Sequence, residues 1–321
     1  METKQLSSLS ICGQLTINMH SLNNEGGEGN QILTRQVTIV DKEGNFKTVN
    51  AVSGDMLKHI QAEHFWNIAV ENGLSLSSAC RKFDANRITA DDEFIKSFKK
   101  ETPDADVLDL VIKKSSLSEV EGILITNNNK NVPRKSCAEF GWLIGLPDKT
   151  KTENYFHVKL VADSGSKESG EGANLGQNIF HRPANSGVYA LVSNFDICRV
   201  GYNDISKKYA IDDKERNNRV TALLKSILYT FIKPTGAMRN TQNPHIVDFN
   251  GVITLSSKAI PAPTTSPIND KYVEEIASIA VTLNKIEKES IAFIPFDSLS
   301  KFVEEFEKII ANATGYKLKE A

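Results

Sequence analysis

The chain has 321 residues and carries 38 Lys and Arg against 40 Asp and Glu, a formal net charge of -2. This balance argues against bulk electrostatic attraction to nucleic acid, so a polyanion would have to be met by a local groove. No apolar run approaches the roughly 18 residues of a membrane span. The first 20 residues also lack the charged-then-apolar layout of a signal peptide. We therefore expect a cytoplasmic protein with no membrane partner.

The N-terminal quarter of the chain contains two clear elements. Residues 9–19 alternate apolar and polar side chains, which predicts a strand with one buried face. Residues 23–30 are so rich in Gly and Asn that we expect an irregular loop, followed by a short strand over 36–40. Ser53 can cap a helix that ends at Asn72-Gly73.

The pattern in the middle of the chain predicts an insertion, after which the main fold resumes. Residues 74–150 contain short helical pieces and one strand at 123–126, which we interpret as an inserted subdomain. A strand is predicted over 155–162, and the Gly/Ser-rich tract 163–176 indicates a flexible projection or linker. Strand character returns over 188–200.

The last third begins with a strongly amphipathic segment. An apolar stripe from Val220 to Phe231 predicts a helix, and 246–255 predicts a strand. Two further helices follow a Pro-rich link, with Glu residues on faces that we expect to be solvated. These helices are either a protein interface or a cap on the fold, and the composition favours the cap.

Without the insertion, the element order is strand, helix, strand, strand, helix, strand. This order predicts an α+β fold with a ferredoxin-like or RNA-recognition palm, in which helices cover one face of an antiparallel sheet and the other face is free to bind. The predicted parts are a palm (1–73 and 151–260), an inserted finger (74–150) and a C-terminal helical segment packing on the palm (261–321).

Residues 216–247 contain no acid but hold five Lys and Arg side chains, including Arg216, Arg219 and Lys225. The segment ends in a Gly-containing loop, 234–243, rich in hydrogen-bond donors. Phosphate groups require such cations together with backbone N–H groups that can come close. The stretch is therefore either an anion site or a solvated helix face with a polar turn, and its composition fits both.

Sites for catalysis, metals or cofactors are not indicated. The six histidines show no metal-ligand spacing, and His59 and His64 lie five apart on a helix rather than four. The four cysteines are far apart and form no C-x-x-C pair, so we expect them to be reduced and buried. Glu25 and Glu28 could hold a divalent ion, although glutamates among glycines are more often solvated.

Several candidate anion-binding residues converge in the predicted topology. The loop after the first strand, the helix start at Ser53 and the loop after Lys233 can all lie along one edge of a ferredoxin-like core. Lys58 and His59 fall near the N-terminal end of the first helix, where the helix dipole favours phosphate.

Four sequence motifs resemble those of a known family. They are 49–59 (VNAVSGDMLKH), 121–124 (EGIL) with 134–136 (RKS), 186–190 (SGVYA) and 236–239 (GAMR) after a long helix. Their order and spacing are similar to those of the DevR-type CRISPR-associated autoregulators, which supply the backbone subunit of type I Cascade complexes. The resemblance covers roughly residues 8 to 256.

The resemblance implies a palm, a finger and a thumb hairpin over 163–187, repeated in several copies that form a helical filament along the CRISPR RNA. The implied partners are the CRISPR RNA, target DNA through the guide, further copies of the chain, and the large, small and guide-end-binding Cascade subunits. The implied RNA-contacting residues are Asn23, Asn24, Arg35, Ser53, Lys58, His59, Leu175, Gln177, Phe180, Arg182, Lys233, Thr235, Gly236, Ala237, Arg239, Asn240 and Gln242.

The chain departs from the family pattern at two places. The usual Asp before the Gly of the finger strand is Glu121, and the loop after the first strand offers Glu25 and Glu28 but no Asp. Relatives that cleave RNA use an aspartate in that loop, so we expect no nuclease activity. The alternatives are an RNA-cleaving enzyme and a transcription regulator. A regulator would need a base-reading helix, whereas the 213–231 helix has an apolar stripe that must be buried.

Overall fold

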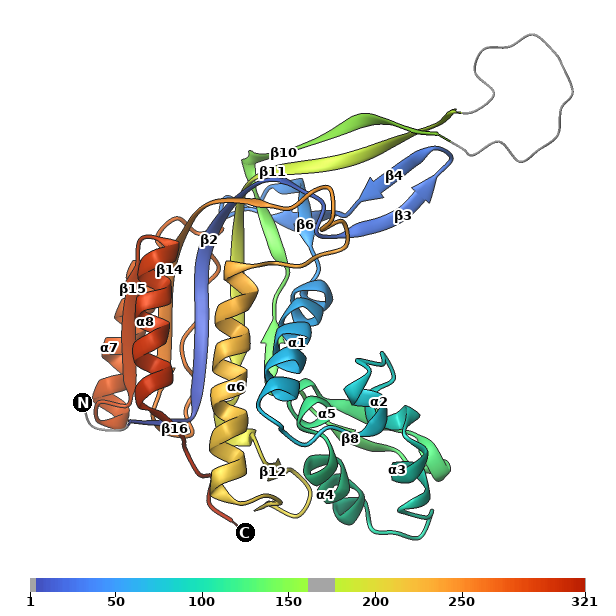
Figure 1. Cartoon of the computed structure of the whole chain (residues 1–321). Helices are drawn as coiled ribbons and strands as arrows, with labels where there is room; N and C mark the ends of the chain where they lie inside the picture. Colours follow the sequence, from blue (N-terminus) through green and yellow to red (C-terminus); the bar gives the residue numbers. More distant parts are fainter. Residues whose placement is uncertain (1–3, 161–176, 321) are drawn as a thin grey trace, which may run out of the picture.

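The structure, a computed structural model, describes residues 4–160 and 177–320. Figure 1 shows a large sheet with helices in front of it, a two-stranded arm at one end and a small helical lobe at the other. The helices are α1 (Gly54–Glu71), α2 (Ser78–Arg81), α3 (Asp92–Lys96), α4 (Asp104–Lys114), α5 (Ser116–Glu121), α6 (Asp213–Ile232), α7 (Tyr272–Glu287) and α8 (Leu299–Asn312). The strands are β1 (Lys4–Leu6), β2 (Ser8–His20), β3 (Asn24–Glu28), β4 (Gln31–Thr34), β5 (Gln36–Val40), β6 (Phe46–Val52), β7 (Ile123–Ile125), β8 (Val132–Arg134), β9 (Ala138–Phe140), β10 (Leu143–Leu160), β11 (Gln177–Phe195), β12 (Tyr202–Asn203), β13 (Lys208–Tyr209), β14 (His245–Ser256), β15 (Ile291–Phe296) and β16 (Ala313–Gly315).

The large sheet contains the predicted palm. Its main path runs β15-β14-β2-β11-β10-β6-β5, and within it β14, β2, β11 and β10 are each antiparallel to their neighbours. With α1 between β2 and β10, and α6 between β11 and β14, the chain follows the β-α-β-β-α-β order of a ferredoxin-like fold. The predicted α+β class is confirmed.

One face of this sheet packs against α1, α6 and α8. The alternating side chains of β2 place Leu9, Ile11, Leu15 and Ile17 in this core, and the α6 stripe from Val220 to Phe231 lies opposite them. Burying each such side chain stabilises the fold by about 1.5–3 kcal/mol. The packing explains why the 213–231 helix cannot present its apolar side to a nucleic acid.

The opposite face is not free, contrary to the prediction. Tyr272 and Ile276 of α7 pack against Cys12 of β2 and Val252 of β14. The link before α7 also lies on this face. Its carbonyls accept hydrogen bonds from sheet side chains: Ser10 Oγ donates to Ala262 (3.3 Å), Gln14 Nε2 to Pro267 (3.2 Å) and Thr254 Oγ1 to Pro263 (3.1 Å). A ligand cannot reach β2 and β14 from this side, because the C-terminal segment covers them.

The helical lobe, α2 to α5 with the β7–β8 hairpin, has a core of its own. It is formed by buried residues including Phe94, Val107, Val111, Ile125 and Val132. The strand pairing places the end of this lobe earlier than the predicted residue 150, because β9 and the start of β10 already pair with β11 and β6 in the large sheet.

The arm is formed by the outer halves of β10 and β11, which are longer than the predicted strands and pair as far as Leu160 and Gln177. Of the predicted thumb, 163–187, residues 163–176 lie outside the described residues. The loop expected at 23–30 is instead part of the β3–β4 hairpin, in which Glu28 pairs with Gln31. Gly29, at φ +57°, supplies the left-handed turn between them.

Candidate nucleic-acid interface

The loop that follows α6, residues 233–243, packs on the end of β2. The Ala237 N–H donates to the Leu22 carbonyl at 3.1 Å. A Cβ atom on Gly236 would lie 2.6 Å from the Leu22 Cα, so only glycine allows this approach. The predicted meeting of the loop after the first strand with the loop after α6 is therefore present in the structure.

The same loop is joined to α1 through Glu63. The Arg239 guanidinium donates to both Glu63 carboxylate oxygens at 2.9 and 2.8 Å, and Thr235 Oγ1 donates to one of them at 2.9 Å. Partial burial would raise the pKa of Glu63, but the hydrogen bonds from Arg239 and Thr235 outweigh it and lower that pKa. Arg239 keeps 49% of its side chain exposed, so an incoming anion can still reach it.

The loop also contacts the base of the arm. Arg182 of β11 donates to Thr241 Oγ1 at 3.3 Å, and Gln242 Nε2 donates to the Pro183 carbonyl at 2.9 Å. Arg182 lies over the Phe180 ring at 4.7 Å, and that ring stacks on His157 with centroids 5.7 Å apart. The arm therefore presents a cation and a pair of flat rings beside the loop. His157 was not among the predicted residues, because a lone histidine in a strand gives no pairing signal.

Two of the predicted RNA-contacting residues, Ser53 and Asn23, form hydrogen bonds inside the fold. Ser53 caps α1 by accepting from the Met56 N–H at 3.2 Å, and Asn23 Oδ1 accepts from the Ser53 N–H at 2.9 Å. Both side chains are buried. They fix the helix start against the end of β2, so their polar atoms hold the fold rather than face a ligand.

The other predicted residues are placed as follows. Lys233 and Asn240 are exposed on the loop. Arg35 forms an ion pair with Glu25 (Nε to Oε1, 2.8 Å) and lies over the Trp142 ring at 5.3 Å. The side chains of Asn24 and Gln177 and the whole of Leu175 lie outside the described residues.

The acid-free stretch 216–247 is only partly an exposed cationic surface. Arg216 is buried and donates to the carbonyls of Val200, Gly315 and Tyr316. Arg219 is buried against Glu119 and Glu215. These two arginines stabilise the fold, so the interpretation of the whole stretch as one anion site is wrong for its helical half.

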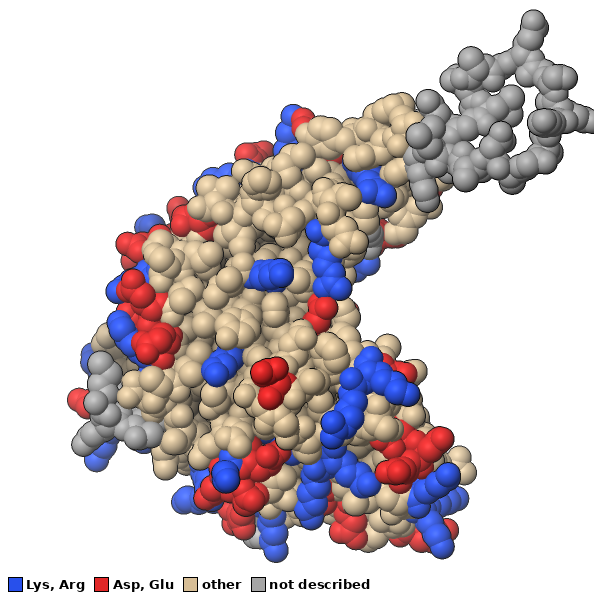
Figure 2. Space-filling view, in the orientation of Figure 1, with Lys and Arg blue, Asp and Glu red and all other residues tan. Residues whose placement is uncertain are grey.

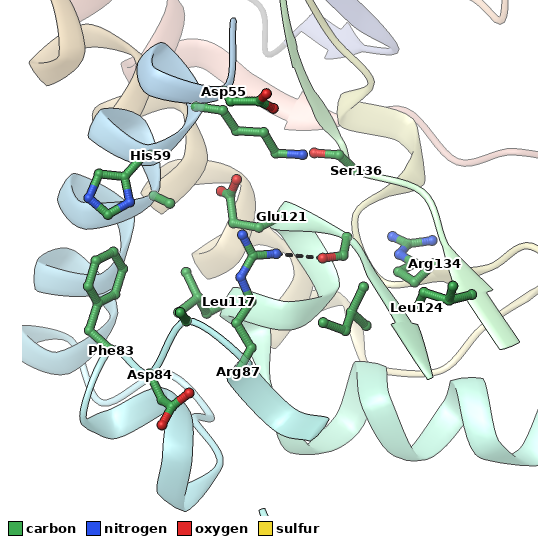
Figure 3. Close-up of a pocket in the computed structure, with 15 residues that line it drawn as sticks. Asp55, His59, Phe83, Asp84, Arg87, Leu117, Glu121, Leu124, Arg134 and Ser136 are labelled. Atoms are coloured by element: carbon green, nitrogen blue, oxygen red, sulfur yellow. Dashed lines mark hydrogen bonds between the residues drawn. The ribbon is translucent and has the colours of Figure 1, made fainter. Parts of the chain in front are cut away.

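Lys58 and His59 lie at a second place, a cavity of about 560 Å³ between α1 and the lobe. Figure 3 shows His59 beside Phe83, and Glu121 with Arg87 on the lobe side. The ring centroids of His59 and Phe83 are 5.6 Å apart. Burial lowers the pKa of Lys58, opposed by the negative charge of Glu121. Arg87 was missed at the sequence level, because nothing in its neighbourhood marks it.

The loop and the cavity lie on the hollowed side of the molecule. Figure 2 shows a deep concavity between the arm and the lobe, with Lys and Arg side chains along it. Within the described residues, no group of three or more His, Cys, Asp or Glu could hold a metal ion. No helix in that part of the chain is long and apolar enough to cross a membrane.

The fold and this concavity define an α+β protein with a ferredoxin-like sheet and a cation-bearing hollow beside it. The family model "CRISPR-associated negative auto-regulator DevR/Csa2" matches residues 11–277. The chain belongs to this family, which confirms the resemblance found in the sequence motifs.

Individual relatives are distant. A Methanocaldococcus jannaschii protein described as "CRISPR-associated protein Cas7/Cst2/DevR" is 26% identical over 292 residues, which cover 87% of this chain and 90% of the relative. Two similar structures are titled "CRISPR RNA-guided surveillance complex, pre-nicking" (11% identity, 95% of this chain and 99% of that one, TM-score 0.49) and "CRISPR RNA-guided surveillance complex" (12%, 89% and 86%, TM-score 0.40). A third, "Crystal structure of Thermofilum pendens Csc2", has 11% identity, covers 96% and 85%, and has a TM-score of 0.38. These structural likenesses are too weak to support a functional argument.

Proposed function

We propose that this chain is a non-catalytic backbone subunit of a type I CRISPR effector that binds the CRISPR RNA. Family membership supports the CRISPR assignment. The observation that carries the RNA-binding role is the loop 233–243, which bears the half-exposed Arg239, is joined to Leu22 and to Glu63 of α1, and contacts Arg182 of β11.

The loop suits the sugar-phosphate backbone of RNA. Arg239 is half exposed and is already held in one position by Glu63. A phosphate can therefore replace that carboxylate with little further loss of side-chain entropy. The exposed Lys233 and Asn240 add further donors. Such contacts hold a strand without reading its sequence, as a subunit that carries many different guides requires.

The arm supplies the second kind of contact. His157 and Phe180 present stacked rings, with Arg182 over the second ring. Aromatic and guanidinium planes stack on any base, so this part of the arm would contact guide bases or a neighbouring subunit. Because the C-terminal segment covers the sheet face at β2 and β14, the RNA path would follow the edge at the loop and the arm rather than the sheet surface.

In the proposed assembly, several copies line up along one guide and present it for pairing with target DNA. The large, small and guide-end-binding subunits complete the complex. The helical lobe as the finger, the palm and the thumb would each take the part that the resemblance implies.

The test is to purify the chain from cells with and without a CRISPR array, and to read the absorbance ratio and the size of the bound RNA. The proposal predicts uniform, array-derived RNA in a large assembly. A clean monomer without RNA from array-bearing cells would overturn it. Incubating the assembly with magnesium and labelled RNA tests the non-catalytic part, because cleavage products would contradict it.

A further inference from the structure

The arm leaves the sheet at a bend that crosses several neighbouring strands. Figure 1 shows β10 and β11 running up through the sheet and then turning over into the arm. The pairings of β10 with β11, of β11 with β2 and of β14 with β2 all shift register at one row of partners, Thr150, Gly187, Ile17 and Ile246. Register shifts of this kind bend a strand and interrupt its ladder of hydrogen bonds. The angle of the arm therefore depends on contacts other than the ladder.

One buried side chain spans this bend. Asn185 of β11 is 1% exposed, and its amide forms hydrogen bonds with three other strands. Its Nδ2 donates to the His20 carbonyl of β2 at 3.2 Å and to Thr34 Oγ1 of β4 at 3.1 Å. Its Oδ1 accepts from Thr152 Oγ1 of β10 at 2.7 Å. A buried amide with partners in three directions specifies one arrangement of these strands, because any other arrangement would leave polar atoms unpaired.

A second chain of hydrogen bonds lies beside Asn185. The Tyr189 hydroxyl donates to Asn50 Oδ1 of β6 at 2.8 Å and lies 2.9 Å from His20 Nε2. Burial lowers the pKa of His20 to about 3, so its ring stays neutral at ordinary pH. Asn50 Nδ2 donates to Thr34 Oγ1 at 3.2 Å, and this is the same oxygen that accepts from Asn185. The two chains therefore form one network, which joins β2, β4, β6, β10 and β11.

The loop 233–243 is attached to the chain on both sides of this network. On the palm side, the loop donates to the carbonyl of Leu22, which follows His20 by two residues. On the arm side, it donates to the carbonyl of Pro183, which precedes Asn185 by two residues. The distance between the cations of the loop and the stacked rings of the arm therefore depends on the angle that the network fixes.

We propose that Asn185 is a positioning residue that fixes the angle of the arm to the palm, and so sets the spacing between the contacts to the RNA backbone and the contacts to its bases. The proposal rests on the RNA-binding function above and adds the residue that lets both kinds of contact act on one strand. Asn185 acts through the arm, because its own side chain is buried. An arm held at one angle loses less conformational entropy on binding than an arm that swings.

RNA titrations of Asn185→Ala and Asn203→Ala form a matched comparison. Asn203 of β12 is also buried, and its Nδ2 donates to the Ala105 carbonyl at 2.8 Å and to Asp109 at 2.6 Å, where the lobe meets the palm. Each variant loses a buried amide with several bonds, so both should lower the melting temperature. Only Asn185→Ala should weaken the binding of guide-length RNA, by about tenfold. The slope of log K against log salt should not change, because the phosphate contacts remain.

Distances between two spin labels report the angle of the arm directly. The four cysteines are buried, so labels can be attached selectively at Val158→Cys of the arm and Glu307→Cys of α8, which are both exposed positions. The proposal predicts one narrow distribution of label distances when Asn185 is present and a broader one in Asn185→Ala. Thr152→Val removes a single bond to Asn185 at nearly constant volume, so it serves where Asn185→Ala does not fold. It should broaden the distribution to a smaller extent.

The outcomes separate this proposal from the proposed function. If Asn185→Ala and Asn203→Ala bind RNA equally well and the label distances do not change, Asn185 contributes to stability alone and the RNA-binding function stands. If the distances broaden while RNA affinity is kept, the arm angle does not govern RNA binding and the positioning role is wrong. A weaker affinity with a shallower salt slope would also overturn it, because a phosphate contact would then have been lost. If the wild type binds no RNA, both proposals fail.

Discussion

Two arginine–glutamate pairs lie where separate parts of this molecule meet, one inside the lobe against the palm and one between the loop after α6 and α1, and they differ chiefly in burial. Arg134 of the lobe contacts Glu119 at 2.6 Å, and both side chains are 0% exposed. Arg239 of the loop after α6 contacts Glu63 of α1 at 2.8 Å, with 49% and 23% of the two side chains exposed. The residue types and distances are alike, so the difference in solvation decides what each pair can do.

The buried pair is part of the fold. Arg134 also donates to the carbonyls of Tyr202 and Arg199 and to Asp204, and Arg219 approaches the same Glu119 from α6. Such a network holds the lobe on the palm, because removing any member leaves a buried charge without a partner and without access to water. The exposed pair has no such penalty, and its arginine can exchange a carboxylate for a phosphate. An ion pair is thus a structural bond at one site and a ligand-exchangeable contact at the other.

The largest effect is expected from breaking the buried pair. Arg134→Ala leaves Glu119 buried without its main partner and should cost about 3–5 kcal/mol of unfolding free energy. Urea unfolding followed by circular dichroism measures this. Lys113→Ala, which removes a lobe cation in an exposed ion pair, is the control and should cost under ~1 kcal/mol. Equal losses in the two variants would show that the buried network does not hold the lobe.

Glu121 extends the comparison, because it is as buried as Glu119 but has no arginine bonded to it. Its pKa is raised to about 7 in the fold from roughly 4.3 in an unfolded chain. The folded state therefore keeps a proton that the unfolded state releases, and stability falls as pH rises from about 4.3 to 7. Raising the pH from 5 to 8 should cost the wild type on the order of 3 kcal/mol more than Glu121→Gln. Parallel pH dependence in the two proteins would contradict this account.

The loop beside the exposed pair can be perturbed without removing a charged side chain. In Gly236→Ala, the new Cβ would meet the Leu22 backbone, and such overpacking should cost about 1–3 kcal/mol and weaken RNA binding by displacing Arg239. Gly27→Ala is the matched control, since its Cβ has an ordinary contact of 3.4 Å. Unfolding curves and RNA titrations measure both effects in the two variants. If Gly236→Ala keeps wild-type stability and RNA affinity, the loop tolerates displacement and this account is wrong.

The sequence predicted the elements whose patterns are local. The alternation in β2, the Ser53 cap of α1 and the stripe of α6 each depend on residues within a few turns, and all three are present. The β3–β4 hairpin was missed, because glycines that signal a loop also permit a tight turn. The covered sheet face was missed because it depends on contacts across more than 250 residues, such as Gln14 with Pro267.

The candidate site shows the same limit. A side chain that caps a helix and one that binds phosphate can be the same residue type, so Ser53 and Asn23 could not be separated from Arg239 by sequence. Likewise, the acid-free run placed buried Arg216 and Arg219 together with exposed Lys233. Only the fold decides which cations reach solvent.

The smallest effect on stability and the sharpest test of RNA binding are expected from the exposed pair. Arg239→Ala should cost less than ~1 kcal/mol of unfolding free energy, yet weaken binding to RNA of every sequence. Lys308→Ala on α8, which loses the same charge from another exposed ion pair, is the control.

The decisive measurement is the RNA affinity of wild type, Arg239→Ala and Lys308→Ala as a function of salt concentration. If Arg239 binds a phosphate, the slope of log K against log salt should be shallower by about 0.7 in Arg239→Ala alone, the value for one lost contact to a single strand. Identical affinities and slopes in all three proteins would contradict the proposal that the loop 233–243 holds the RNA backbone.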